Sequence, residues 1–265
     1  MTLIMGVVNA SPDSFSGDGF DDPHAAVSHG FDLVRDGADL LDIGAESTRP
    51  GFTPVPAAAQ INRLVPVLEG LAAVGVPLSA DTMSAEVANA AIGAGVAFIN
   101  DVSGGLADAD MLPLIARCEV DYICGWWTGW PQHELGDDLN AHPPITTSSR
   151  PLWRRTIDEL LWRRDALLDA GVPAGRIVLD PGLGFGKSAG DNWQILAHLD
   201  AITALGHRVL IGASRKRFVD HSDIATATIT SWCAQHDVWA VRVHDVAANR
   251  QTIAVMDKLT SGDAA

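Results

Sequence analysis

The chain of 265 residues carries 18 basic and 33 acidic side chains, which gives a net charge of −15. This balance argues against broad binding to nucleic acids or to anionic membranes, because both need a positively charged surface. With 47% hydrophobic and 19% charged residues, the composition is that of a globular protein with a large core. The chain starts without basic residues, and no apolar run approaches the roughly 18 residues of a membrane span, so we expect a cytoplasmic protein.

Short β-branched apolar runs alternate with helical patterns along the whole chain. The predicted strands are Leu3–Asn9, Leu40–Glu46, Pro77–Thr82, Phe98–Ser103, Val120–Trp126, Ile177–Pro181, Arg208–Ser214 and Ala240–Val246. Helices are predicted near residues 23–37, 56–73, 84–95, 108–117, 150–170, 191–205, 222–236 and 247–260. Eight such units predict an α/β protein in which residues 1–265 form one domain, a single (β/α)8 TIM barrel. The alternative is an open doubly wound sheet, which the count of eight disfavours.

Polar residues lie at or near the C-terminal ends of seven of the predicted strands. They are Asn9, Glu46, Asp81, Asn100 with Asp101, Asp180, Ser214, and His244 with Asp245. Barrel enzymes place their chemistry at this face. Any one of these residues has a simpler explanation, because Asp and Asn often cap the following helix or hold a turn. The repetition at one end of so many strands favours a functional site.

One stretch, residues 177–187, runs from an apolar strand through a carboxylate and a glycine-rich turn to a lysine. The dinucleotide fingerprint G-x-G-x-x-G does not fit, because the third glycine arrives one residue early. A nucleotide P-loop would place Pro181, which has no N–H, at its first glycine. We therefore expect Asp180 to lie beside backbone that can approach a flat ligand closely. The following helix is expected to carry Lys187 away from this pocket.

The residue types at the strand ends favour one ligand chemistry and leave a second one open. Asp81, Asn100 and Asp180 suit a ligand with adjacent N–H donors, such as a 2-amino-4-oxo pyrimidine edge. Carboxylates also suit a divalent metal, although the chain has no H-E-x-x-H or paired-histidine spacing. Basic side chains at the ends of strands two, seven and eight would form an anion site with Asn9. They are Arg49, Arg215, Lys216, Arg217, Arg242 and His244.

Two of these basic groups have open interpretations. Residues 215–217, taken alone, are better explained as a solvated basic turn. His244 is either a general base, because imidazole titrates near neutrality, or a neutral hydrogen-bond donor to an anionic leaving group. Arg242 lies two residues before His244 and is therefore expected on the same face of the strand.

These motifs resemble dihydropteroate synthase, the folate-pathway family targeted by sulfonamides, from the first strand to the last helix. The matching segments are Met5–Ser16, Asp42–Gly51, Asp81–Thr82, Ile99–Val102, Asp180–Lys187, Ile211–Lys216 and Val241–Asp245. The resemblance implies a transferase that binds small molecules and forms a homodimer through its later helices. Its reaction condenses 6-hydroxymethyl-7,8-dihydropterin pyrophosphate with p-aminobenzoate to give 7,8-dihydropteroate and pyrophosphate.

The resemblance also implies where each substrate contacts the chain. The pterin would meet Asp81, Asn100, Asp180, Phe185, Gly212, Lys216 and Arg242, with Arg242 stacked on its face. Loops with Ser11, Pro12 and Phe15 and with Thr48, Arg49 and Pro50 would close over p-aminobenzoate. The pyrophosphate would meet Asn9, Arg49, Arg242 and His244, and Mg²⁺ would bind near Asn9.

The implied reaction is an ionisation in which pyrophosphate leaves and the aniline nitrogen attacks the pterin methylene cation. Its expected catalytic residues are Asn9, Arg49, Asp81, Asp180, Lys216, Arg242 and His244, which would act mainly by electrostatic stabilisation. One alternative is a catalytically silent pterin-binding paralogue, because the first, fifth and seventh loops depart from the family pattern. The fifth loop, for example, carries Trp126, Trp127 and Trp130. A pterin-dependent methyltransferase barrel is a further alternative, but it would not need the 47–51 loop in this form.

Overall fold

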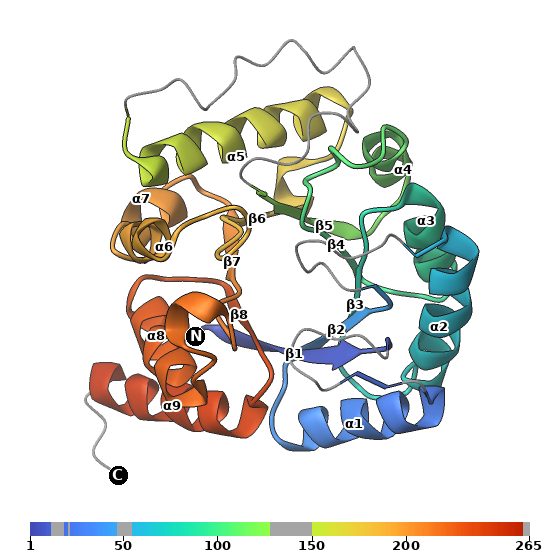
Figure 1. The fold of residues 1–265 in the computed structure, drawn as a ribbon, viewed down its shortest axis with the longest axis horizontal. Coiled ribbons are helices and arrows are strands. Elements are labelled where there is room, and N and C mark those ends of the chain that lie inside the picture. Colours follow the sequence, from blue (N-terminus) through green and yellow to red (C-terminus); the bar gives the residue numbers. More distant parts are fainter. Residues whose placement is uncertain (12–18, 21, 47–54, 128–149, 262–265) are drawn as a thin grey trace.

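The computed structural model describes residues 1–11, 19–20, 22–46, 55–127 and 150–261. Eight parallel strands form a closed barrel in chain order, and the last strand pairs with the first (Figure 1). The strands are β1 (Leu3–Asn9), β2 (Leu40–Gly44), β3 (Leu78–Asp81), β4 (Phe98–Asp101), β5 (Asp121–Gly125), β6 (Ile177–Asp180), β7 (Arg208–Ile211) and β8 (Ala240–Val243). This closure confirms the (β/α)8 barrel and excludes the open sheet.

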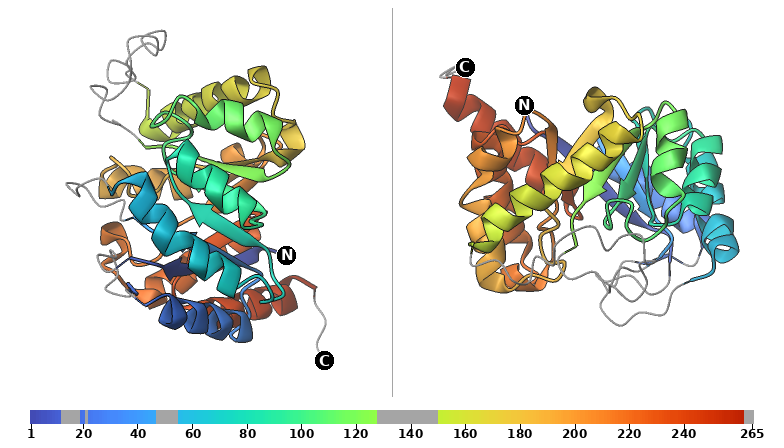
Figure 2. Two further views of the ribbon diagram at one scale, coloured as in Figure 1. Left: turned by 90° about the vertical axis from the view of Figure 1, so that its right-hand side faces the viewer. Right: turned by 90° about the horizontal axis from the view of Figure 1, so that it is seen from above.

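Helices surround the strands on the outside of the barrel (Figure 1, Figure 2). They are α1 (Pro23–Arg35), α2 (Ala57–Gly70), α3 (Ala85–Gly93), α4 (Met111–Arg117), α5 (Leu152–Asp169), α6 (Ala189–Leu196), α7 (Leu199–Thr203), α8 (Asp223–Gln235) and α9 (Val246–Ser261). Within the described residues, none of these helices combines the length and the hydropathy needed to cross a membrane.

The strands after β1 end earlier than predicted, and in β4 and β6 the terminal aspartate takes over a backbone hydrogen bond. The Asp101 carboxylate accepts the N–H of Ser103 at 2.8 Å, and the Asp180 carboxylate accepts the N–H of Gly182 at 2.8 Å. An aspartate that bonds the backbone two residues later forms a turn in place of further strand pairing. Asp101 and Asp180 therefore also terminate the strands that they end.

The helix predicted over residues 191–205 is two helices, α6 and α7. The break lies at His198, whose φ and ψ of −122° and 30° are not helical. Its ring stacks on Trp153 of α5, with 3.9 Å between the ring centroids. This contact with a neighbouring helix gives a physical reason for the turn that the helical pattern alone did not predict.

The interior of the barrel has an apolar floor, which we define as the buried cluster inside the strands. It consists of Met5, Leu40, Phe98, Ile123, Val178, Leu210 and Ala240. Successive side chains of a strand alternate between the interior and the helices, so the next inward positions along the strands lie above this floor. Those positions are largely polar and form the site described below.

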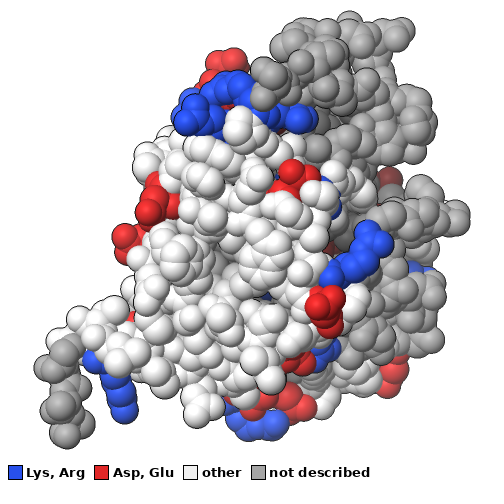
Figure 3. Space-filling model, turned by 60° about the vertical axis from the view of Figure 1, so that its left-hand side comes forward, with Lys and Arg blue, Asp and Glu red and all other residues white. Residues whose placement is uncertain are grey.

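The outer face of the later helices carries several exposed apolar side chains. They are Trp193 of α6, Ile224 and Trp232 of α8, and Val255 and Leu259 of α9. The middle of this face is mostly free of charged residues (Figure 3). A contiguous uncharged face of this kind is typical of a contact surface with another protein.

Candidate active site

Arg242 of β8 connects the polar residues of three other strands. Its Nε donates to Oδ2 of Asp42 at 2.6 Å, and its Nη2 donates to Oδ2 of Asp81 at 2.9 Å. Asn100 of β4 donates from Nδ2 to the same Asp42 oxygen at 2.8 Å. The barrel thus brings three expected site residues together around one carboxylate that was not predicted to belong to the site.

Asp42 escaped the sequence prediction because it lies within a strand rather than at its end. Its side chain is fully buried, and its Oδ1 has no hydrogen-bond partner among the described residues. The signal was a carboxylate inside the apolar run Leu40–Ile43, since a buried carboxylate is kept only where it is paired. We call Asp42, Asp81, Asn100 and Arg242 the polar cluster.

The polar cluster holds two carboxylates against one guanidinium. Burial raises the pKa of Asp81, Arg242 opposes this shift, and the neighbouring Asp42 adds to it. Such a site favours a ligand edge that offers hydrogen-bond donors or positive charge, because either one would relieve the repulsion between the carboxylates.

The turn after β6 brings Asp180 and Phe185 to the barrel mouth. Burial raises the pKa of Asp180, and the ammonium of Lys216 is the main group that opposes this shift. Gly182 has a φ of +64°, and a Cβ there would lie 1.9 Å from the carbonyl oxygen of Trp126. Only glycine fits this contact. The glycine at position 182 is therefore explained by close packing of the turn against the chain just after β5. Phe185 packs against Trp127, with ring centroids 5.0 Å apart.

Lys216 reaches across the mouth from the end of β7 to the turn after β6. Its ammonium donates to the carbonyl oxygen of Leu183 and lies 4.5 Å from the centre of the Phe185 ring. Burial lowers the pKa of Lys216 to about 8, and Asp180 opposes this shift. A Cβ at Gly212 would lie 3.8 Å from Lys216 Nζ and 3.9 Å from Arg242 Cβ, so this glycine lies between the two cations.

The basic run at residues 215–217 separates in the structure. Arg215 pairs with Asp223 in the first turn of α8, with 3.1 Å between Nε and Oδ1. Arg217 is exposed at the start of a short 3₁₀ helix. Only Lys216 of this run faces the turn after β6. The solvated-turn interpretation holds for Arg217, whereas Arg215 is partly buried in its ion pair with Asp223.

His244 lies beside Ser214 and near the two cations Lys216 and Arg242. Its Nδ1 is 2.9 Å from Ser214 Oγ, and this hydroxyl also accepts the backbone N–H of His244 at 3.2 Å. Burial, followed by Arg242 and Arg215, lowers the pKa of His244 to about 3. The imidazole is therefore neutral at pH 7, which favours the hydrogen-bond donor over the general base.

Asn9 ends β1 at the same face, where its backbone oxygen accepts the N–H of Phe20 at 3.0 Å. Ser11 is buried nearby. The described residues contain no group of three or more His, Cys, Asp or Glu side chains that would hold a metal. The remaining predicted residues, Pro12, Phe15, Thr48, Arg49, Pro50 and Trp130, lie outside the described part of the chain.

Other polar residues at strand ends are structural. Asp101 accepts hydrogen bonds from Ser103, from the N–H of Gly105 and from the Tyr122 hydroxyl at 2.7 Å. Glu46 accepts the N–H of Val55 at 2.7 Å, and this bond connects the residues that directly precede and follow positions 47–54. The repeated pattern at strand ends therefore includes both turn-forming and site residues.

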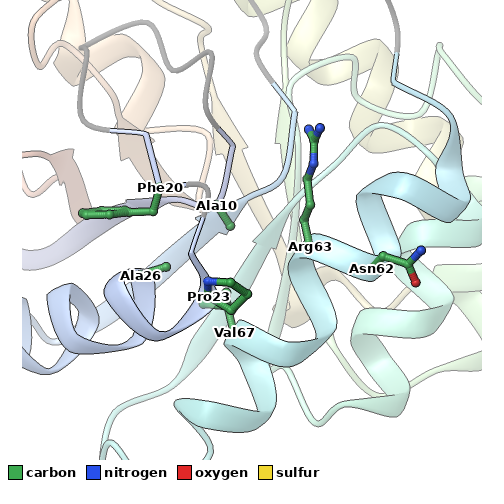
Figure 4. A pocket seen from close by; sticks show the side chains of 7 residues that line it. All are labelled: Ala10, Phe20, Pro23, Ala26, Asn62, Arg63 and Val67. Carbon is green, nitrogen blue, oxygen red and sulfur yellow. The ribbon is translucent and has the colours of Figure 1, made fainter.

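A small cavity of about 110 Å³ lies between the end of β1 and the helices α1 and α2, apart from the polar cluster (Figure 4). It is lined by Ala10, Phe20, Pro23, Ala26, Asn62, Arg63 and Val67, from the end of β1 and from α1 and α2 (Figure 4). Arg63 is the one charged group of this lining, and its Nη1 lies 3.5 Å from the Ala45 carbonyl oxygen. None of the polar cluster lines the cavity, so we assign the chemistry to the mouth.

Comparison with known proteins gives the family. Residues 5–244 match the family model described as "Pterin binding enzyme". A dihydropteroate synthase of Mycobacterium leprae is 39% identical over 96% of this chain and 92% of its own length. A structure of Xanthomonas albilineans dihydropteroate synthase with 4-aminobenzoic acid has 35% identity and a TM-score of 0.85, covering 99% of this chain and 94% of that one.

A second structure of the Xanthomonas albilineans enzyme, in complex with 7,8-dihydropteroate, has 32% identity and a TM-score of 0.80. It covers 98% of this chain and 93% of that chain. The resemblance inferred from the motifs is thus confirmed over nearly the whole length. The chain belongs to the dihydropteroate synthase family of pterin-binding transferases.

Proposed function

We propose that the chain condenses 6-hydroxymethyl-7,8-dihydropterin pyrophosphate with p-aminobenzoate to give 7,8-dihydropteroate and pyrophosphate. The polar cluster is the observation that carries this proposal, because its buried carboxylates gather where a flat ligand with N–H donors would lie. Relatives whose structures contain 4-aminobenzoic acid or 7,8-dihydropteroate support the same substrates.

The pterin would occupy the space above the apolar floor. Asp81, Asn100 and Asp180 would read its polar edge, while Phe185, Gly212 and Arg242 would border its faces. Bidentate contacts between carboxylates and adjacent N–H donors are both strong and directional. Lys216 already lies against Phe185 and would turn its ammonium toward the ring oxygen and nitrogen.

The chemistry proposed for the site separates charge rather than removing a proton at the start. The bond between the pterin methylene carbon and the pyrophosphate oxygen breaks, and its electron pair leaves with pyrophosphate. The aniline nitrogen then attacks the methylene carbon and loses a proton. Asp81 and Asp180 would stabilise the cationic pterin, while Arg242 and neutral His244 would stabilise the leaving group.

Mg²⁺ is proposed as the cofactor, with Asn9 as its contact on this chain. An amide oxygen at the mouth suits this ion, which is commonly held by few protein ligands together with water and substrate phosphates. When bound, the ion would supply positive charge to the pyrophosphate oxygens.

A homodimer is proposed through the outer face of the later helices. The exposed Trp193 and Trp232 support this, because aromatic side chains are enriched in the buried centres of protein interfaces. The scarcity of charge in the middle of this face supports it further (Figure 3). The cytoplasmic location stays a prediction.

The test is an assay with the dihydropterin pyrophosphate, p-aminobenzoate and Mg²⁺, in which dihydropteroate and pyrophosphate are both measured. The proposal expects the two products in equal amounts. Tight binding of the pterin pyrophosphate without any product would favour the catalytically silent paralogue instead.

A further inference from the structure

Lys187 turns back under the glycine-rich turn instead of leaving with the next helix. Helix α6 begins only at Ala189, after Ser188 has capped it with a reciprocal hydrogen-bond pair to Asp191. Gly186 directly before Lys187 has a φ of +63°, which reverses the chain. The expectation that α6 carries this lysine away from the pocket was therefore wrong.

The ammonium of Lys187 bonds three backbone carbonyl oxygens. It donates to Trp126 at 3.0 Å, to Gly182 at 2.8 Å and to Phe185 at 3.2 Å. A lysine has three N–H donors, so all of them are used within the protein. The bond to Trp126 joins the turn to the chain just after β5, where Gly182 makes its closest approach.

Two lysines thus hold the same turn from two sides. Lys187 bonds the carbonyls of Gly182 and Phe185, while Lys216 bonds that of Leu183 between them. Because Lys187 holds the Phe185 carbonyl, it also holds the backbone from which the Phe185 ring extends. This ring packs against Trp127 and Lys216. The positive charge of Lys187 further opposes the rise in the pKa of Asp180 that burial causes.

We propose that Lys187 is a positioning residue for the pterin site, which holds the 182–185 turn on β5 so that Phe185 and Asp180 keep their places. Lys187 would not touch the substrate, since its donors are already occupied. Because this inference rests on the proposed pterin chemistry, it predicts an effect on the pterin substrate and not on p-aminobenzoate.

The test compares the wild type with Lys187→Met, which removes the charge and the donors but keeps an unbranched side chain that is only one atom shorter. Loss of charged hydrogen bonds to the turn is expected to raise the Kd for the dihydropterin pyrophosphate about 10- to 100-fold. The KM for p-aminobenzoate at saturating pterin should not change. Lys258→Met is the matched control, because Lys258 is the only other lysine besides Lys216 and is exposed on α9.

Hydrogen exchange of the peptide 181–188 gives a second measurement that needs no turnover. It should become faster in Lys187→Met, while peptides of the apolar floor keep wild-type rates. Lys187→Arg keeps the charge and several donors, so its Kd should lie between those of the wild type and Lys187→Met. It serves as the test variant if the methionine variant does not fold.

An unchanged pterin Kd in a folded Lys187 variant would overturn the positioning role, as would an equal loss for both substrates. These outcomes are distinct from failure of the proposed function. A wild type that binds the pterin pyrophosphate but forms no product would overturn the function, while the Kd comparison would still decide the role of Lys187.

Discussion

The apolar floor and the polar cluster occupy successive inward positions of the same barrel and use opposite chemistry. Ile123 and Val178 belong to the floor, where packing density decides stability. Asp42, higher in the barrel, is fully buried, and Arg242 beside it has 23% of its side chain exposed; the two depend on each other for charge compensation. The comparison teaches that one strand can supply an apolar core residue at one position and a charge-compensated polar residue two residues later.

The largest expected effect comes from breaking the charge pairing of the polar cluster. Arg242→Met leaves Asp42 and Asp81 without their shared cation, so we expect a loss of about 3–5 kcal/mol in the free energy of unfolding. Turnover should also be lost. Urea unfolding measures the first effect, and Arg217→Met, at an exposed position, is the control.

Adding Asp42→Asn to Arg242→Met sharpens this prediction. The double variant should lose less stability than the sum of the two single variants, because the asparagine removes the uncompensated charge. Additive losses would contradict the pairing described for these two residues.

A substitution in the apolar floor should lower stability without lowering activity. Ile123→Ala removes packed atoms from a fully buried site, and we expect it to lower the free energy of unfolding by about 2–5 kcal/mol. Below its melting temperature, the folded variant should keep the wild-type kcat/KM for both substrates. A marked loss of kcat/KM in the folded protein would show that the floor and the cluster are not separable.

A smaller effect concerns the pH dependence of activity and of stability. Lys216, with a pKa of about 8, should lose its charge as the pH rises, so kcat/KM for the pterin should fall above that pH. Unfolding frees this lysine to bind its proton again, so its contribution to stability should rise with pH between about 8 and its ordinary pKa. The contributions of Lys216 to activity and to stability should therefore change in opposite directions over this range.

The Lys216→Arg variant distinguishes the titration of Lys216 from that of Lys187. Burial lowers the pKa of Lys187 to about 7. An arginine stays charged, so the part of the activity loss due to position 216 should move to higher pH. If the pH profiles of kcat/KM coincide for the wild type and Lys216→Arg, the assignment of this activity loss to Lys216 is contradicted. His244, with a pKa of about 3, should contribute no step between pH 5 and 8.

Periodic features of the sequence predicted the fold, whereas contacts between distant segments decided the details of the site. The alternation of strands and helices was enough for the closed barrel, and the strand ends located Asp81, Asn100, Asp180 and Arg242. Asp42 was missed because it lies inside a strand and not at its end, although a carboxylate within an apolar run was the signal that could have found it. The direction of Lys187 depends on three glycines with positive φ, at 182, 184 and 186, and their turn is fixed by packing against Trp126 and by a hydrogen bond from Lys216, both distant in the sequence.

The most direct test of the pterin site is a calorimetric titration of the dihydropterin pyrophosphate into the wild type, Asp180→Asn and Ile123→Ala. Asparagine keeps an oxygen for the Gly182 N–H but loses the charge and one acceptor. We predict that Asp180→Asn raises the Kd about 10- to 100-fold, while folded Ile123→Ala keeps the wild-type value. An Asp180→Asn protein that binds as tightly as the wild type would contradict the account of the polar mouth as the pterin site.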